Sequence, residues 1–123
     1  MNSEDLPQAV ARVESPTLNG IVERNQVWPV MAAKYNVENP VPPWKTSLDG
    51  LCEALDHASC KADVPDFKQR RDEEDLLSAT RYADLPYPEN QLVALAHSLM
   101  ARGVIAEDDL KQRMSGIRAR LEA

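Results

Sequence analysis

Two cysteines and a histidine, Cys52, His57 and Cys60, lie in one short stretch and are the first candidates for chemistry. Zinc sites in proteins usually present paired ligands in CxxC or HxxxH spacing, and a single Cys/His pair does not supply them. We therefore expect structural roles for these three residues, reduced thiols, and no metal bound by this chain.

The usual nucleophile signals are also missing from the sequence. No serine lies in a GxSxG motif, and no glycine-rich phosphate loop is present. His97 lies between apolar turns, where a lone histidine is usually a hydrogen-bonded neighbour of the core. Residue patterns alone thus point to a helical protein without chemistry of its own.

Adjacent arginines, Arg70 and Arg71, stand in the charged segment KQRRDEED. They can form i, i+4 pairs with Glu74 and Asp75, in the less favourable orientation and worth only a few tenths of a kcal/mol each. Composition alone assigns both arginines to a solvated helix face.

Length and charge restrict the partners that this protein can have. A chain of 123 residues fits one domain. Its formal charge of −6 argues against nucleic acid or an anionic membrane as the main partner. The sequence has no apolar run of membrane-spanning length and begins MNSEDLPQAV, which lacks the order of a signal peptide. We expect a cytoplasmic protein.

Prolines dominate the first part of the chain, and each one disfavours helix for the residue before it. We therefore predict an extended, proline-rich arm over residues 1–45, with at most a short helix from Trp28 to Tyr35. Trp28 and Trp44 need burial, and we expect them to pack on a partner subunit. The alternative is a disordered tail, which seldom carries so many large apolar residues.

Helical patterns occupy residues 46–123, which we assign to a single all-α domain of about four helices. One helix is predicted from Thr46 or Ser47 to Ala58, and another from the region of Pro65 to Leu77. A helical hairpin is predicted from Asp84 to the end of the chain. Its turn contains Gly103, and its two helices would lie antiparallel. The expected buried faces are Leu92, Leu95, Ala96 and Leu99 on the first helix, and Leu110, Met114, Ile117 and Leu121 on the second.

The segment Asp66 to Leu110 resembles the helical N-terminal half of the nitrile hydratase beta subunit and the small beta subunit of thiocyanate hydrolase. The resemblance is carried by Pro86-Tyr87 and by LVALAHSLMARGVIAEDDL, which is similar to the family's Pro-Tyr-Tyr turn, apolar helix, (K/R)-G-(V/I)-(L/I) turn and acidic second helix. Pro88 stands here where the family commonly has a second tyrosine. The family's arginine, fifteen residues before the proline of that turn, corresponds to Arg71.

The resemblance implies that the active-site residues and domains are divided among several subunits. Arg71 would contact the oxidised cysteines of a metal site in a partner, and Tyr87 would be a binding residue. The cobalt(III) or iron(III) would be held by a C-x-x-C-S-C claw on an alpha-type subunit, a motif that this chain lacks. The β-barrel of the usual beta subunit would be a separate chain.

The implied function is that of a beta-type subunit in a lyase complex that hydrates a nitrile to an amide, inactive alone. Two alternatives within the resemblance are the beta-type subunit of thiocyanate hydrolase, acting on thiocyanate, and an activator that delivers metal to the catalytic subunit. A third, non-catalytic alternative is a plain helical interaction module.

Overall fold

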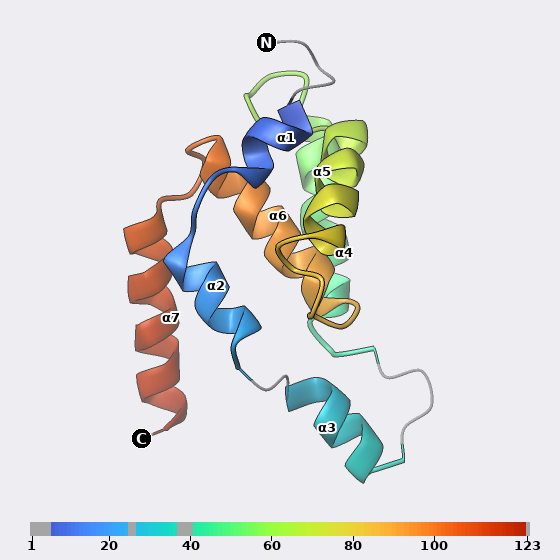
Figure 1. Cartoon of the computed structure of the whole chain (residues 1–123), viewed down its shortest axis with the longest axis vertical. Helices are drawn as coiled ribbons and strands as arrows, with labels where there is room; N and C mark the ends of the chain where they lie inside the picture. The colour runs from blue at the N-terminus through green and yellow to red at the C-terminus, as the bar shows by residue number, and fades with distance from the viewer. Residues whose placement is uncertain (1–5, 25–26, 37–40, 123) are drawn as a thin grey trace.

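The computed structural model describes residues 6–24, 27–36 and 41–122, and these ranges contain helices and no strand (Figure 1). This confirms the predicted all-α class for the described part of the chain. In chain order the helices are α1 (Leu6–Ala11), α2 (Pro16–Val22), α3 (Val27–Lys34), α4 (Lys45–Ala58), α5 (Phe67–Ala79), α6 (Glu89–Ala101) and α7 (Glu107–Leu121).

Helix α6 is the centre of the fold and is buried on more than one side. On one side Val93 and Ala94 join a core cluster that also contains Leu18 of α2 and Leu77 of α5. On another side its residues pack on α4, in a second cluster that consists of Leu48, Leu55, Leu95 and Leu99. Because α6 lies between these two clusters, its burial exceeds the single stripe expected from the sequence. Leu92, predicted to be buried, is 40% exposed, whereas Val93 is 3% exposed.

The ends of α5 and α6 are set by local chemistry. At the start of α5, Asp66 and Gln69 form a reciprocal capping box, with Gln69 N donating to Asp66 Oδ1 at 2.8 Å and Asp66 N donating to Gln69 Oε1 at 3.0 Å. The helix therefore begins just after Pro65 rather than including it. At the end of α6, Gly103 has a φ of +76° and Val104 N donates to Leu99 O at 2.9 Å, which closes the helix as predicted.

The prediction of an extended arm over residues 1–45 is wrong for the segment from Leu6 to Val22. This segment forms two short helices, separated near Ser15, and α1 packs on α5 and α6 (Figure 1). The prolines are compatible with this arrangement because Pro16 occupies the first turn of α2, where a missing N–H has no helical partner to lose. Leu18, 1% exposed, belongs to the main core.

The antiparallel hairpin of α6 and α7 is not confirmed. Helix α7 packs against α2 instead (Figure 1). Among the described residues of α7, Leu110 near its start is packed against the core cluster that contains Val93 and Ala94 of α6. Ile117 and Leu121, predicted to be buried, are 47% and 80% exposed. Two amphipathic sequences joined by a short turn did not by themselves specify which neighbour the second helix would cover.

The predictions for the two tryptophans, Trp28 and Trp44, have different outcomes. Trp44 is half-buried against the cluster formed by α4 and α6, so this chain itself supplies packing for it. The side chain of Trp28 lies outside the described residues. The short helix expected after it is present as α3, which Figure 1 shows apart from the other helices and whose Val30 and Tyr35 are each 63% exposed.

Candidate functional site: a groove between α4, α5 and α6

A groove of about 380 Å³ lies where α5 and α6 face each other beside α4. Helix α5 lines it with residues at i, i+3, i+4, i+7 and i+8, and α6 with residues at i, i+4 and i+7, so each helix presents one stripe. The lining residues are Cys52 from α4, Phe67, Arg70, Arg71, Glu74 and Asp75 from α5, and Gln91, Leu95 and Ser98 from α6.

Arg70 and Arg71 differ sharply although they are neighbours. Arg70 donates from Nη1 to Asp56 Oδ1 at 2.6 Å and to Pro65 O at 3.2 Å, and its side chain is 11% exposed. The prediction that Arg70 pairs with Glu74 is therefore wrong, because the guanidinium of Arg70 forms its ion pair with Asp56 near the end of α4. Within the described part of the chain, no hydrogen bond or ion pair engages Arg71, which is exposed. The pair expected between Arg71 and Asp75 is likewise not formed.

Burial changes the titration of two groups in the groove. Burial raises the pKa of the Glu74 carboxyl, and nearby Asp75 raises it further. Burial also raises the pKa of the Cys52 thiol, which keeps it protonated near neutral pH. The cysteine is therefore a weak nucleophile in this position.

Gln91 is a groove residue that sequence reasoning missed. Its Oε1 is buried and accepts no hydrogen bond in the structure. An unpaired buried acceptor is unfavourable by about 1–3 kcal/mol. The sequence signal was its position four residues before Leu95 on the apolar helix, but only the tertiary structure shows which face Gln91 shares.

Tyr87, the other residue implicated by the resemblance, does not line the groove. It lies just before α6 and is 66% exposed, with the Nζ of Lys45 5.7 Å from its ring centroid. The structure thus places Arg71 in the groove and Tyr87 beside the start of α4.

The cysteine and histidine candidates do not converge. Cys52 is half-buried in the groove, whereas Cys60 and His57 are exposed and meet only through the Cys60 thiol, 3.2 Å from the His57 carbonyl oxygen. Among the described residues, no group of three or more His, Cys, Asp or Glu side chains is placed to hold a metal ion.

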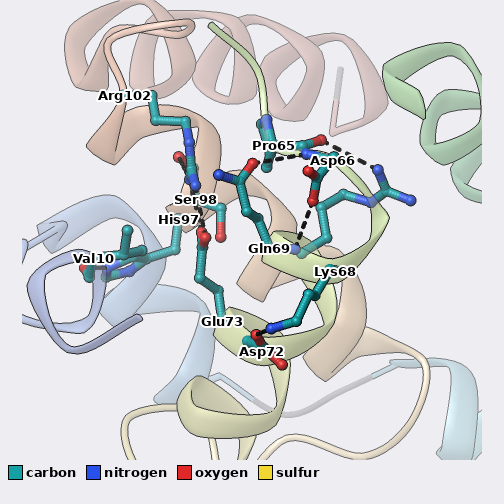
Figure 2. A network of polar contacts seen from close by, with 11 residues as sticks. Val10, Pro65, Asp66, Lys68, Gln69, Asp72, Glu73, His97, Ser98 and Arg102 are labelled. Carbon is teal, nitrogen blue, oxygen red and sulfur yellow. Dashed lines mark hydrogen bonds and ion pairs between the residues drawn. The ribbon is translucent and has the colours of Figure 1, made fainter. Parts of the chain in front are cut away.

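Two buried polar contacts link α6 to its neighbours α5 and α1. Figure 2 shows Glu73 of α5 and Arg102 at the end of α6 facing each other, joined by two hydrogen bonds. It also shows His97 pointing toward Val10 of α1, where its Nε2 donates to the Val10 carbonyl oxygen at 2.7 Å. His97 Nδ1 then accepts from the Tyr82 hydroxyl at 2.7 Å. The expectation that His97 is a satisfied core residue is confirmed.

No family model, characterised protein or solved structure matches the chain. Within the described residues, no helix has the length and apolar character needed to cross a membrane.

Proposed function

We propose that this chain is a beta-type subunit of a nitrile hydratase-like complex, in which Arg71 extends into the active site of a partner subunit. The resemblance of Asp66 to Leu110 gives the proposal its chemistry. In such a complex water adds across the C≡N bond of a nitrile at the partner's cobalt(III) or iron(III), giving an amide. This chain would bind no metal itself and would act with the claw-bearing alpha-type subunit and a separate β-barrel subunit.

The observation that supports the proposal is the difference between the two arginines. Arg70 is held by Asp56 and Pro65, whereas Arg71 makes no hydrogen bond or ion pair within the described part of the chain. A guanidinium that projects from a helix and is not hydrogen-bonded inside its own chain is available for an acceptor on another chain. Its planar fork can serve two oxygens of an oxidised cysteine at once.

Conservative substitution of Arg71 in the assembled complex tests this role. Arg71→Lys keeps the charge and loses the fork, so kcat for nitrile hydration should fall at least about tenfold, equivalent to 1.4 kcal/mol. Arg70→Lys is the matched control, and its kcat should stay near the wild-type value, because Arg70 is ion-paired with Asp56 inside its own chain. Equal, near-wild-type turnover of both variants with unchanged metal content would remove Arg71 from the active site.

The chain purified alone provides an independent test of the subunit assignment. It should contain no stoichiometric cobalt or iron and should not hydrate a nitrile, because the implied claw is on the partner. Metal analysis by mass spectrometry measures this directly. Near-stoichiometric cobalt or iron on the lone chain would contradict the assignment.

A further inference from the structure

Helix α7 carries an apolar stripe that the described part of the chain leaves largely uncovered. Leu110 is packed against the core, but Met114 is only half-buried, and Ile117 and Leu121 are 47% and 80% exposed. These four residues follow one another at the alternating four-residue and three-residue steps of the a and d positions in a coiled-coil heptad. The spacing of the stripe therefore suits packing against a second helix.

The stripe borders a groove of about 740 Å³ between α2 and α7, which we name the α2–α7 groove. Met114, Ile117 and Leu121 line it from α7, and Gly20 lines it from α2. A Cβ atom added at Gly20 would meet no neighbour within 4 Å, so the groove is open beside this glycine. Figure 1 shows α7 at the edge of the fold, with α2 beside it. The α2–α7 groove shares no lining residue with the groove that contains Arg71.

Every charged residue between Leu110 and Leu121 is basic. The heptad places these residues beside the stripe, with Lys111 and Arg118 at e positions and Arg113 and Arg120 at g positions. Within the described residues, Arg113 and Arg120 make no hydrogen bond or ion pair. Both sides of the stripe are therefore positively charged, on a chain whose formal charge is −6.

These charges favour an acidic partner helix over other occupants. In a coiled coil the e and g residues of one helix face those of the other, so opposite charges attract and like charges repel. Two copies of α7 would bring basic flanks against basic flanks, which disfavours self-association through this stripe. An anionic bilayer would meet Glu107, Asp108 and Glu122, which line the same groove, and a chain of negative net charge.

We propose that the α2–α7 groove binds an amphipathic helix of another polypeptide, whose apolar stripe is flanked by acidic residues. The apolar side chains of that helix lie against Ile117 and Leu121, and its carboxylates accept from Arg113 and Arg120. The interface goes beyond the proposed function, because it involves neither Arg71 nor a metal. It is tested without turnover, so failure of one proposal leaves the other standing.

Two synthetic helices of about three heptads, with leucine at every a and d position, test the partner chemistry on the full-length chain. One peptide has glutamate at the e and g positions, and the other has lysine there. The glutamate peptide should bind at least about tenfold more tightly and should shift the amide NMR signals of α2 and α7. Equal binding of the two peptides, or tighter binding of the lysine peptide, would overturn the proposal.

A double substitution locates the apolar contact. Ile117→Gln with Leu121→Gln replaces two exposed side chains, keeps a helix-compatible residue at each position, and should raise the Kd for the glutamate peptide at least about tenfold. Val41→Gln with Leu51→Gln, at positions 52% and 43% exposed, is the matched control and should leave the Kd unchanged. An unchanged Kd in the α7 double variant would contradict the proposed interface.

Charge reversal tests the choice of partner separately from the apolar area. Arg113→Glu with Arg120→Glu removes no hydrogen bond or ion pair within the described residues, so the fold should be retained. The variant should bind the glutamate peptide more weakly and the lysine peptide more tightly, each by at least about fivefold. A preference for the glutamate peptide as strong as that of the unsubstituted chain would show that these arginines do not select the partner, and would overturn the proposal.

Two further measurements detect the other occupants. Sedimentation of the chain alone should show a monomer, and a dimer that dissociates in Ile117→Gln with Leu121→Gln would assign the stripe to a second copy instead. Vesicles of phosphatidylcholine with phosphatidylglycerol should not bind the chain. Vesicle binding that the same double variant abolishes would assign the stripe to an anionic membrane. Either result would overturn the proposal.

Discussion

Glu73 and Arg102 form a bidentate ion pair that joins the middle of α5 to the end of α6. The Nη1 to Oε1 distance is 2.7 Å and the Nη2 to Oε2 distance is 2.6 Å, with side chains 0% and 9% exposed. Arg102 Nη1 also donates to Ser98 O at 3.1 Å. Both charges are removed from water, so each depends on the other for compensation.

Removal of one member of this pair should strongly destabilise the fold. Glu73→Ala leaves a buried guanidinium without its carboxylate, and we expect the free energy of unfolding to fall by about 3–5 kcal/mol in urea denaturation. Asp72→Ala breaks the solvent-exposed Lys68 pair one residue away and should lower it by less than ~1 kcal/mol. Similar losses in both variants would show that burial does not strengthen the Glu73 contact.

A double variant tests whether the packing of α5 on α6 needs the ionic contact itself. Glu73→Leu with Arg102→Met replaces both partners by apolar side chains and leaves no buried charge unpaired. Its stability should exceed that of Glu73→Ala and lie near wild type, because the desolvation penalty disappears together with the attraction. Double-mutant stability as low as that of Glu73→Ala would mean that the α5 and α6 packing needs the ionic contact itself.

His97 should make stability depend on pH. Burial lowers its pKa from the ordinary value of 6.5, against an opposing effect of the Val10 hydrogen bond. The unfolded chain therefore binds a proton at higher pH than the folded chain does. The stabilising contribution is present above about pH 6.5 and is lost as pH falls through the unfolded pKa toward the folded one. We expect the melting temperature to fall between about pH 7 and pH 5.

Variant pH profiles attribute this slope to His97. His97→Gln should flatten the profile in that range, whatever its effect on absolute stability, and His57→Gln, at an exposed position, should not. Glu74, whose pKa is raised, acts in the opposite sense and is present in all variants, so the difference between profiles isolates the histidine. A slope retained in His97→Gln would contradict the assignment.

Glu107 should attach α7 to α2. Its carboxylate accepts from Ser15 Oγ at 2.7 Å and from Thr17 N at 2.8 Å, at the start of α2. Burial raises its pKa, but these hydrogen bonds outweigh burial and hold the pKa below the usual value. Glu107→Ala should lower the free energy of unfolding by about 1–3 kcal/mol and increase the rate of amide hydrogen exchange in α7. Asp108→Ala, in the same helical turn, loses only a helix-dipole contact of about 0.3–1 kcal/mol.

Leu18 should anchor the N-terminal helices in the core. Leu18→Ala leaves a cavity beside Leu77 and should lower the free energy of unfolding by about 2–5 kcal/mol. Deletion of residues 1–24 should likewise reduce the helical circular dichroism of the remainder. An unaltered signal and melting temperature after this deletion would restore the interpretation of the segment as a separable arm.

Local chemistry of the sequence determined much of this protein. The all-α class and the four helices between Lys45 and Leu121 follow from apolar spacing, and the end of α6 follows from a glycine that tolerates positive φ. The choice of Arg71 came only from the resemblance. Composition could not separate it from Arg70, because both have the same local neighbours.

Tertiary structure decided what depends on residues distant in the sequence. Asp56 lies fourteen positions before Arg70 and forms an ion pair with it, whereas Glu73 pairs with Arg102 across twenty-nine positions. Periodicity shows that a helix has an apolar face but not which helix covers it, so α7 was assigned to α6 although it packs on α2. The groove depends on the same physical fact, since Gln91 and Arg71 share it only because α5 and α6 pack together.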